Sequence, residues 1–302
     1  DCLLQYVRSG AIAVTKSHTE ELNEFLKQRE LDFEAQKNIP HQPHRIMNEA
    51  TDSIGRYHFV VEPFHEDFTG HVSWNMLGTR LLQCASQHAA EFGYGSVMAE
   101  QEACIWVLSR LSIEMNRRPA THQDYCVETW VAGIQRQFTD RYYRIVGADG
   151  TVYGSASSVW ALIGRESRRP ISLEQLQQKH PSMALLKVNR PDVAIPQPAR
   201  IRGRATEPCR RITALCSDID INGHVNSIRY IDHVLDLFSF EKLCEQEVRR
   251  IDMTYSNEAF CHQELDLYLT TEETGCLYVV EIKHTDGKPV CKARIEFVPA
   301  AE

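Results

Sequence analysis

The sequence contains one short stretch twice. Residues 67–73 read DFTGHVS, and residues 220–226, 153 positions later, read DINGHVN. Four of the seven positions are identical, and two others exchange one small polar residue for another. Each copy stands directly before a segment with the pattern of a helix. Such a match at equivalent places indicates a duplicated domain.

The sequence around each copy follows the same order. Residues 73–92 and 228–238 place apolar side chains at three- and four-residue steps, which predicts a helix with one buried face. Strand-like runs flank both helices: 57–62, 105–113, 125–132, 138–146 and 151–163 in the first half, and 211–217, 248–255, 265–270, 276–283 and 290–298 in the second. The pattern predicts an α+β fold, a tandem or double hotdog, in which each long central helix is wrapped by an antiparallel sheet. Each copy can extend the other's edge strand, giving a pseudo-dimer within one chain.

The charge is spread unevenly and suggests a linker. Residues 165–211 carry eleven Lys or Arg against four Asp or Glu, a net +7, although the whole chain has −8. They also hold six of the twelve prolines, which is typical of a connector. Its arginines fit a solvated connector or a docking strip for an acidic partner equally well. The candidate docking residues are Arg200, Arg202, Arg204, Arg210 and Arg211.

Four segments follow from these patterns. We expect an N-terminal extension of unknown role at 1–55, where Ser17 and Glu20 predict a capped helix. A first hotdog domain at 56–165, a basic Pro-rich linker at 166–205 and a second hotdog domain at 206–302 complete the chain.

Composition and spacing exclude several classes of protein. The 302 residues are 43% apolar and 25% charged, as in ordinary globular proteins. No apolar run approaches the ~18 to 20 residues of a membrane helix, and no signal peptide is visible, so we expect a soluble cytoplasmic protein. The acidic balance disfavours nucleic acid. Ten cysteines without a CxxC pair and thirteen histidines without HExxH predict buried, reduced thiols and no metal site.

The second copy belongs to a longer motif. Residues 217–230 read SDIDINGHVNSIRY, and three shorter stretches, IWVLSRL at 105–111, ETWV at 128–131 and SASSVW at 155–160, accompany it. Together they resemble the acyl-acyl carrier protein (acyl-ACP) thioesterases of plants and bacteria, over about residues 56–298. The resemblance implies hydrolysis of fatty acyl-ACP to free fatty acid in fatty acid biosynthesis, without metal or organic cofactor. It implies acyl carrier protein as the partner, and a pseudo-dimeric monomer or a homodimer.

By the same resemblance, four residues match catalytic positions: Asp220, Asn222, His224 and Glu258. Two positions depart from the family pattern. Ala259 stands where plant members carry a cysteine, which removes a cysteine nucleophile there, and Ser227 replaces a second asparagine.

The residue types suit thioester hydrolysis. We expect Glu258 to act as general base for water, or alternatively as a nucleophilic carboxylate. Asn222 and His224 would position water and thioester and Asp220 would orient them, since alternate residues of an extended loop point the same way. The backbone amides of Gly223 and Val225, at a helix start, are candidates for the oxyanion hole.

Other interpretations compete with this one. Taken alone, an Asp-x-Asn-x-His stretch before a helix is more often a turn with a cap. In the first copy Thr69 replaces the amide, and residues 116–118 offer no carboxylate, so that half is expected to hold the acyl chain instead. Trp106, Trp130 and Trp160 are candidates for the tunnel wall or for plain core. The competing functions are an acyl-CoA thioesterase, a hotdog dehydratase and a non-catalytic acyl-thioester-binding module.

Overall fold

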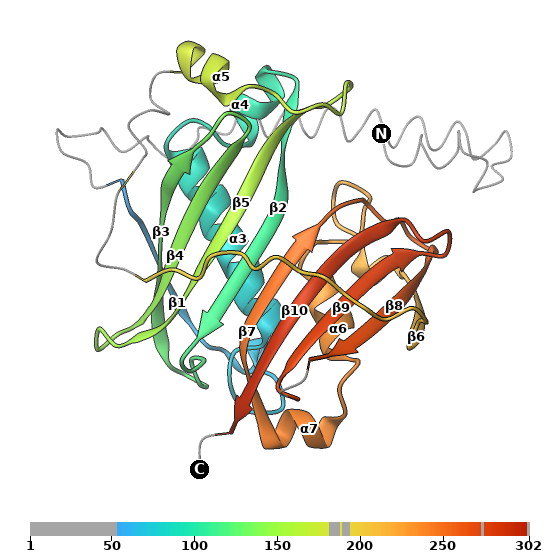
Figure 1. The fold of residues 1–302 in the computed structure, drawn as a ribbon. Helices are drawn as coiled ribbons and strands as arrows, with labels where there is room; N and C mark the ends of the chain where they lie inside the picture. Colours follow the sequence, from blue (N-terminus) through green and yellow to red (C-terminus); the bar gives the residue numbers. More distant parts are fainter. Residues whose placement is uncertain (1–52, 181–187, 189–193, 273–274, 301–302) are drawn as a thin grey trace, which may run out of the picture. The chain divides into compact units, whose positions relative to one another are not determined.

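One antiparallel sheet of ten strands forms the centre of the described structure (Figure 1). The computed structural model describes residues 53–180, 188, 194–272 and 275–300, so the helix predicted near Ser17 lies outside the described residues. The strands are β1 (Gly55–Val60), β2 (Cys104–Met115), β3 (Asp124–Ile134), β4 (Phe138–Gly147), β5 (Val152–Gly164), β6 (Arg210–Thr213), β7 (Gln246–Tyr255), β8 (Glu264–Thr271), β9 (Leu277–His284) and β10 (Pro289–Pro299).

The sheet has two halves with the same topology. Read across the sheet, the order is β1-β3-β4-β5-β2-β7-β10-β9-β8-β6, so each half follows the same path from its outer edge to the centre. The halves join where β2 pairs with β7, from Arg110 opposite Thr254 to Glu114 opposite Arg250. Each half thereby covers an edge strand of the other, as the duplicated sequence predicts.

Helix α3 (Trp74–Glu91) is the long helix predicted for the first half. Ser73 caps it, its hydroxyl accepting a hydrogen bond from the Met76 amide at 3.1 Å. The buried face includes Leu77, Leu81 and Ala85, at the predicted spacing. At Gly78 a Cβ atom would lie only 2.9 Å from Cδ1 of Ile228, so the absence of a side chain there lets α3 approach the second half closely.

The helix of the second half is shorter than predicted. Instead of one helix over 228–238, the chain forms α6 (Arg229–Leu235) and then α7 (Phe240–Glu245). The amides of Leu237 and Phe238 bond three residues back rather than four. Ser239 then caps α7 by accepting from the Lys242 amide at 3.2 Å. The Phe238 ring packs on Tyr278 and Phe297 of the sheet, both at 4.9 Å between centroids, which holds the break in place.

The linker is hydrogen-bonded to the sheet. Residues 194–209, which include the end of the linker and the approach to β6, cross the sheet in front of the strands in Figure 1, whereas α3 and α6 lie behind them. Ser157 on β5 donates to the Pro196 carbonyl at 2.6 Å, and Arg250 on β7 donates to the Gln197 carbonyl at 2.6 Å. Polar side chains of the sheet thus bind the backbone of this segment, whereas the side chains of Arg200, Arg202 and Arg204 stay exposed. Both interpretations of the arginines, solvated connector and docking strip, stay predictions.

The predicted linker also contains a helix. Helix α5 (Leu173–Lys179) buries Leu173 and Leu176 in a small apolar cluster that includes Met98 of α4 (Ser96–Gln101). Two leucines three residues apart are too weak a periodic signal to predict so short a helix. Across the described part of the chain, every helix is too short or too polar to traverse a membrane.

The cysteines are less uniformly buried than predicted. Cys84, Cys104 and Cys291 are buried free thiols inside α3, β2 and β10, as expected. Four others are exposed, because they lie in turns, in α7 and in loops before strands rather than on the core side of a strand: Cys209, Cys216, Cys244 and Cys276.

Candidate active site

The repeated stretch of the second half forms a tight turn. The Asp220 amide donates to the His224 carbonyl at 2.9 Å, and the Gly223 amide donates to the Asp220 carbonyl at 3.0 Å. The Asp220 carboxylate accepts the Asn222 amide at 2.8 Å. Gly223 has a φ of +80°, in the left-handed region that favours glycine. The prediction that these side chains alternate along an extended loop is therefore wrong, because the chain reverses direction here.

A second loop, directly after β7, brings Glu258 to this turn. The Val225 amide donates to the Ala259 carbonyl at 2.8 Å and fastens the two loops together. Oε2 of Glu258 then lies 3.4 Å from Nε2 of His224. The Glu258 side chain is 37% exposed and that of His224 is 25% exposed, so a substrate can reach both. The ring of Phe260 packs edge-on against the His224 ring at 5.3 Å.

Glu258 has a second partner, which sequence reasoning missed. The guanidinium of Arg168 donates to Oε1 of Glu258 in an ion pair. Arg168 lies in the turn after β5, where its amide bonds the Gly164 carbonyl at 2.9 Å. Strands β5 and β7 lie on either side of β2 and both pair antiparallel with it, so they run in the same direction. Their carboxyl ends therefore lie at the same end of the sheet. No local pattern could pair residues 90 positions apart, and Arg168 was predicted only as one of the basic residues of the linker.

The predicted backbone donors of an oxyanion hole are already engaged. The Gly223 amide closes its own turn and the Val225 amide holds the Glu258 loop, as described above. Helix α6 starts only at Arg229, and just before it the Asn226 side chain accepts the Ile228 amide at 2.9 Å. The assignment of Gly223 and Val225 to an oxyanion hole is therefore corrected: these amides shape the site.

The first half builds the same two loops with different chemistry. Its Val72 amide donates to the Pro119 carbonyl at 2.9 Å, the same link that joins the loops of the second half. Arg118 directly precedes Pro119, just as Glu258 directly precedes Ala259, so Arg118 occupies the position of Glu258. Arg118 forms an ion pair with Asp67 of its own turn. The prediction that this half lacks the carboxylate is confirmed, and a residue of opposite charge stands in its place.

The imidazole of the first half also has other contacts. Nδ1 of His71, the counterpart of His224, lies 2.8 Å from the carbonyl of Thr69. Thr69 replaces Asn222, and Arg118 donates to its hydroxyl at 3.0 Å. This turn therefore keeps the backbone of the site and replaces its acid and amide.

The five predicted docking arginines fall into two groups. Nε of Arg211 lies 2.6 Å from Oδ1 of Asp266, and Arg210 donates to the Asp236 carbonyl at 2.8 Å, so both are engaged within the protein. The other three are exposed, and the described residues provide no partner for their side chains: Arg200, Arg202 and Arg204.

Two helix-and-sheet halves joined edge to edge, one of them with an accessible acid–imidazole pair, define a double hotdog protein. Two family models match the chain: "Acyl-ACP thioesterase N-terminal domain" over residues 55–176 and "Acyl-ACP thioesterase C-terminal domain" over residues 205–299. A crystal structure of an acyl-ACP thioesterase from Bacteroides thetaiotaomicron is 38% identical, with a TM-score of 0.75, and the match covers 82% of this chain and 98% of that one. The chain belongs to the acyl-ACP thioesterase family, which confirms the resemblance and the predicted fold.

Plant proteins are more distant relatives. A palmitoyl-acyl carrier protein thioesterase of Cuphea hookeriana is 25% identical over 65% of this chain. An oleoyl-acyl carrier protein thioesterase of Arabidopsis thaliana is 25% identical over 78% of it. The match spans 49% of the Cuphea protein and 68% of the Arabidopsis protein.

Proposed function

We propose that this protein is a thioester hydrolase that releases free fatty acid from fatty acyl-ACP. The observation that carries the proposal is the contact between Glu258 and His224, formed by two loops of the second half and open to solvent. Family membership supports the same chemistry. A role in fatty acid biosynthesis follows from that substrate. The cytoplasmic location stays a prediction, since the plant relatives are named chloroplastic.

The geometry suits general-base catalysis. Glu258 accepts a proton from water as the water oxygen bonds to the thioester carbon. The carbon–sulfur bond then breaks, and the proton passes to the leaving thiolate, with His224 close enough to Glu258 to relay it. We assign the exposed side-chain amide of Asn222 as the donor to the carbonyl oxygen, because its nitrogen carries two hydrogens and only one is directed at Oδ2 of Asp220, at 3.5 Å. Asp220 keeps Asn222 in place through the 2.8 Å bond to its backbone.

We assign the acyl chain to the first half. Arg118 gives that half no base, and α3 presents a long apolar face. Trp130 is fully buried, whereas the indole nitrogen of Trp106 donates to the Tyr94 carbonyl at 3.0 Å and that of Trp160 to Ser158 at 2.8 Å. These contacts fit core packing, so we place no tryptophan in the tunnel wall. Each buried methylene contributes ~0.8 kcal/mol, so two carbons change binding by roughly 15-fold.

We assign docking of the acidic carrier to the exposed arginines at 200, 202 and 204. Replacing all three by Glu is expected to raise KM for acyl-ACP and leave the rate on a short acyl-CoA unchanged. Arg136→Glu, at an exposed arginine between β3 and β4 and outside residues 165–211, is the matched control. An equal loss on both substrates would show that the arginines serve stability and not docking.

The proposed function is tested by incubating the purified protein with acyl-ACP and acyl-CoA carrying the same series of acyl groups. We expect released fatty acid, with kcat/KM higher for acyl-ACP. Higher kcat/KM for acyl-CoA would make the protein an acyl-CoA thioesterase. Binding without release would make it a non-catalytic acyl-thioester-binding module.

A further inference from the structure

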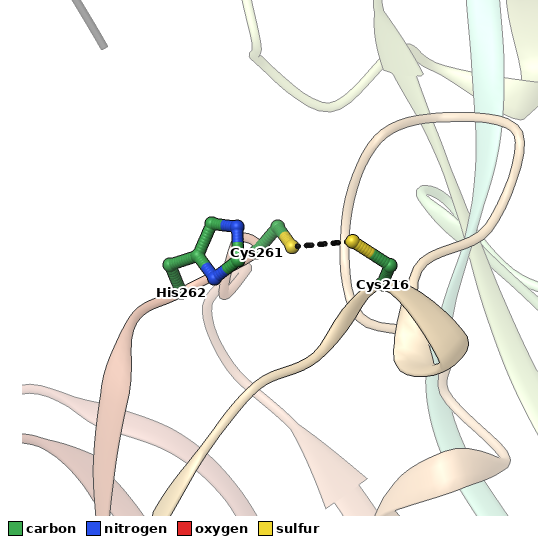
Figure 2. A group of neighbouring side chains, drawn as sticks. All are labelled: Cys216, Cys261 and His262. Carbon is green, nitrogen blue, oxygen red and sulfur yellow. Dashed lines mark hydrogen bonds between the residues drawn. The ribbon is translucent and has the colours of Figure 1, made fainter. Parts of the chain in front are cut away.

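Two thiols and an imidazole gather beside the candidate active site. Figure 2 shows Cys216 and Cys261 with their sulfur atoms facing one another and the His262 ring next to them. The sulfur atoms are 3.5 Å apart, and one ligand atom from each of the three residues lies within 4.8 Å of the others. Cys216 and His262 are exposed and Cys261 is partly buried, so an ion from solvent can reach the cluster. No spacing motif indicated this cluster, because 45 positions separate the two cysteines.

The separation of the two sulfur atoms is close to that in a tetrahedral zinc site. Two thiolates bound to Zn²⁺ at ~2.3 Å lie about 3.8 Å apart in a tetrahedron, and a thiolate and an imidazole nitrogen about 3.5 Å apart. A disulfide requires about 2.05 Å between the sulfur atoms, well below the observed spacing. Two thiolates and one imidazole are a ligand set that zinc uses with a fourth position left to water. We propose that Cys216, Cys261 and His262 bind one Zn²⁺ ion.

The backbone holds the three ligands in place before any ion binds. The His262 amide donates to the Ala214 carbonyl at 2.7 Å, and the Ala214 amide donates to the Gln263 carbonyl at 2.9 Å. Cys216 begins the short 3₁₀ turn η3 (Cys216–Asp218), where the Asp218 amide bonds the Leu215 carbonyl. A preformed set of ligands lowers the cost of ordering them around a metal.

The first half forms the same backbone arrangement without cysteines. There the His122 amide donates to the Val61 carbonyl at 2.8 Å, and the turn η1 (Pro63–His65) stands where η3 does. Like His262, His122 has a positive φ, but the residues at the two cysteine positions are Pro63 and Thr121. The thiols are thus specific to the half that carries Glu258, and folding alone does not explain them.

The site would connect the two catalytic loops. Cys216 lies four positions before Asp220, and Cys261 three positions after Glu258. A bound ion would add a second link to the hydrogen bond between Val225 and Ala259. We therefore expect Zn²⁺ to raise the melting temperature, because it binds the folded arrangement and joins two segments distant in sequence.

Cobalt substitution tests the proposal on the full chain, kept reduced. One equivalent of Co²⁺ should give thiolate-to-cobalt charge-transfer absorption and tetrahedral d–d bands, both abolished by Zn²⁺. Cys261→Thr, which copies the first half, Cys216→Ser and His262→Ala should each weaken cobalt affinity at least about tenfold. The exposed thiols of Cys209 and Cys244 are matched controls, and Cys209→Ser and Cys244→Ser should leave the spectrum unchanged.

Two results would overturn the assignment. One is absence of the absorption bands, or bands that survive Cys216→Ser and Cys261→Thr. The other is a loss of two free thiols on mild oxidation together with no cobalt band under reducing conditions, which would make the pair a disulfide site. Circular dichroism confirms that each variant is folded, and none of these readouts depends on the proposed hydrolase activity.

Discussion

At the scale of single residues, both carboxylate oxygens of Glu258 have a partner. Oε2 faces His224 at 3.4 Å and Oε1 accepts from Arg168. A hydrogen bond between two charged groups is stronger than a neutral one, so the Arg168 contact holds the carboxylate with its other oxygen beside His224. We assign Arg168 as a positioning residue, since it acts on the candidate base and not on the substrate.

Removal of this guanidinium should slow turnover without weakening substrate binding. Arg168→Met is expected to lower kcat on acyl-ACP about 10- to 100-fold with KM little changed, because a misplaced base loses reactivity. Arg168→Lys should recover part of the rate, since it restores the charge. Steady-state kinetics with Arg169→Met, in the same turn, provide the control. Equal losses in both Met variants would assign the effect to the turn itself.

At the scale of secondary-structure elements, local patterns predicted the strands well and the helices unevenly. The strand-like run at 138–146 predicted β4 to within one residue, because its aromatic and β-branched residues favour a strand locally. The break between α6 and α7 was missed, since it depends on Phe238 packing on the sheet. The turn at Gly223 was named only as the competing interpretation of the Asp-x-Asn-x-His stretch, and the hydrogen bond from the Asn222 amide to the Asp220 carboxylate is the one that such a turn forms.

Helix α3 carries a buried histidine that makes stability depend on pH. Burial, together with the positive charge of Arg141, lowers the pKa of His88 from 6.5 to about 3. Nη1 of Arg141 lies 3.2 Å from Nδ1 of His88, an arrangement that only a neutral imidazole tolerates. The unfolded chain takes up this proton below pH 6.5 and the folded chain does not. Stability is therefore complete above pH 6.5 and falls as the pH drops toward 3.

His88→Gln should flatten that dependence. Each pH unit in this window costs the native protein about 1.4 kcal/mol through His88, a term that the variant lacks. Urea unfolding at several pH values from about 7 to about 5 measures the slope. His58→Gln, on the exposed side of β1, is the control. Identical slopes for the native protein and His88→Gln would disprove the assignment.

At the scale of the whole molecule, the duplication could be predicted because the stretches DFTGHVS and DINGHVN are still similar in sequence. The seam between β2 and β7 was only expected in general terms, since edge pairing leaves no mark in either strand. The contact of Arg168 with Glu258 depends on that seam and could not be predicted before it. Most of the fold thus followed from local pattern and repeat, whereas the site needed the relative placement of the two halves.

The seam is predicted to make both halves unfold together. Asp252 of β7 is almost fully buried there and accepts from Ser112 of β2 at 2.6 Å, from Arg250 at 2.8 Å and from Arg294 at 3.2 Å. Asp252→Asn should cost about 3 to 5 kcal/mol, because it leaves charged partners unpaired. Glu247→Gln, exposed on β7, is the control and should have little effect.

Two probes can check that cooperativity. All four tryptophans lie before residue 161, so their fluorescence reports on the first half, whereas circular dichroism reports on both. We expect coincident thermal transitions in the native protein and, at lower temperature, in Asp252→Asn. Separate transitions in the native protein would show that the halves are independent.

The most direct test of the central claim is the kcat of Glu258→Gln on acyl-ACP. This substitution keeps the shape of the side chain and removes the base, so we predict a loss on the order of 10² to 10⁴ in kcat with an unchanged melting temperature. His71→Ala, in the first half, should keep near-native turnover because Arg118 stands where that half would need its acid. Near-native turnover in Glu258→Gln would contradict the account.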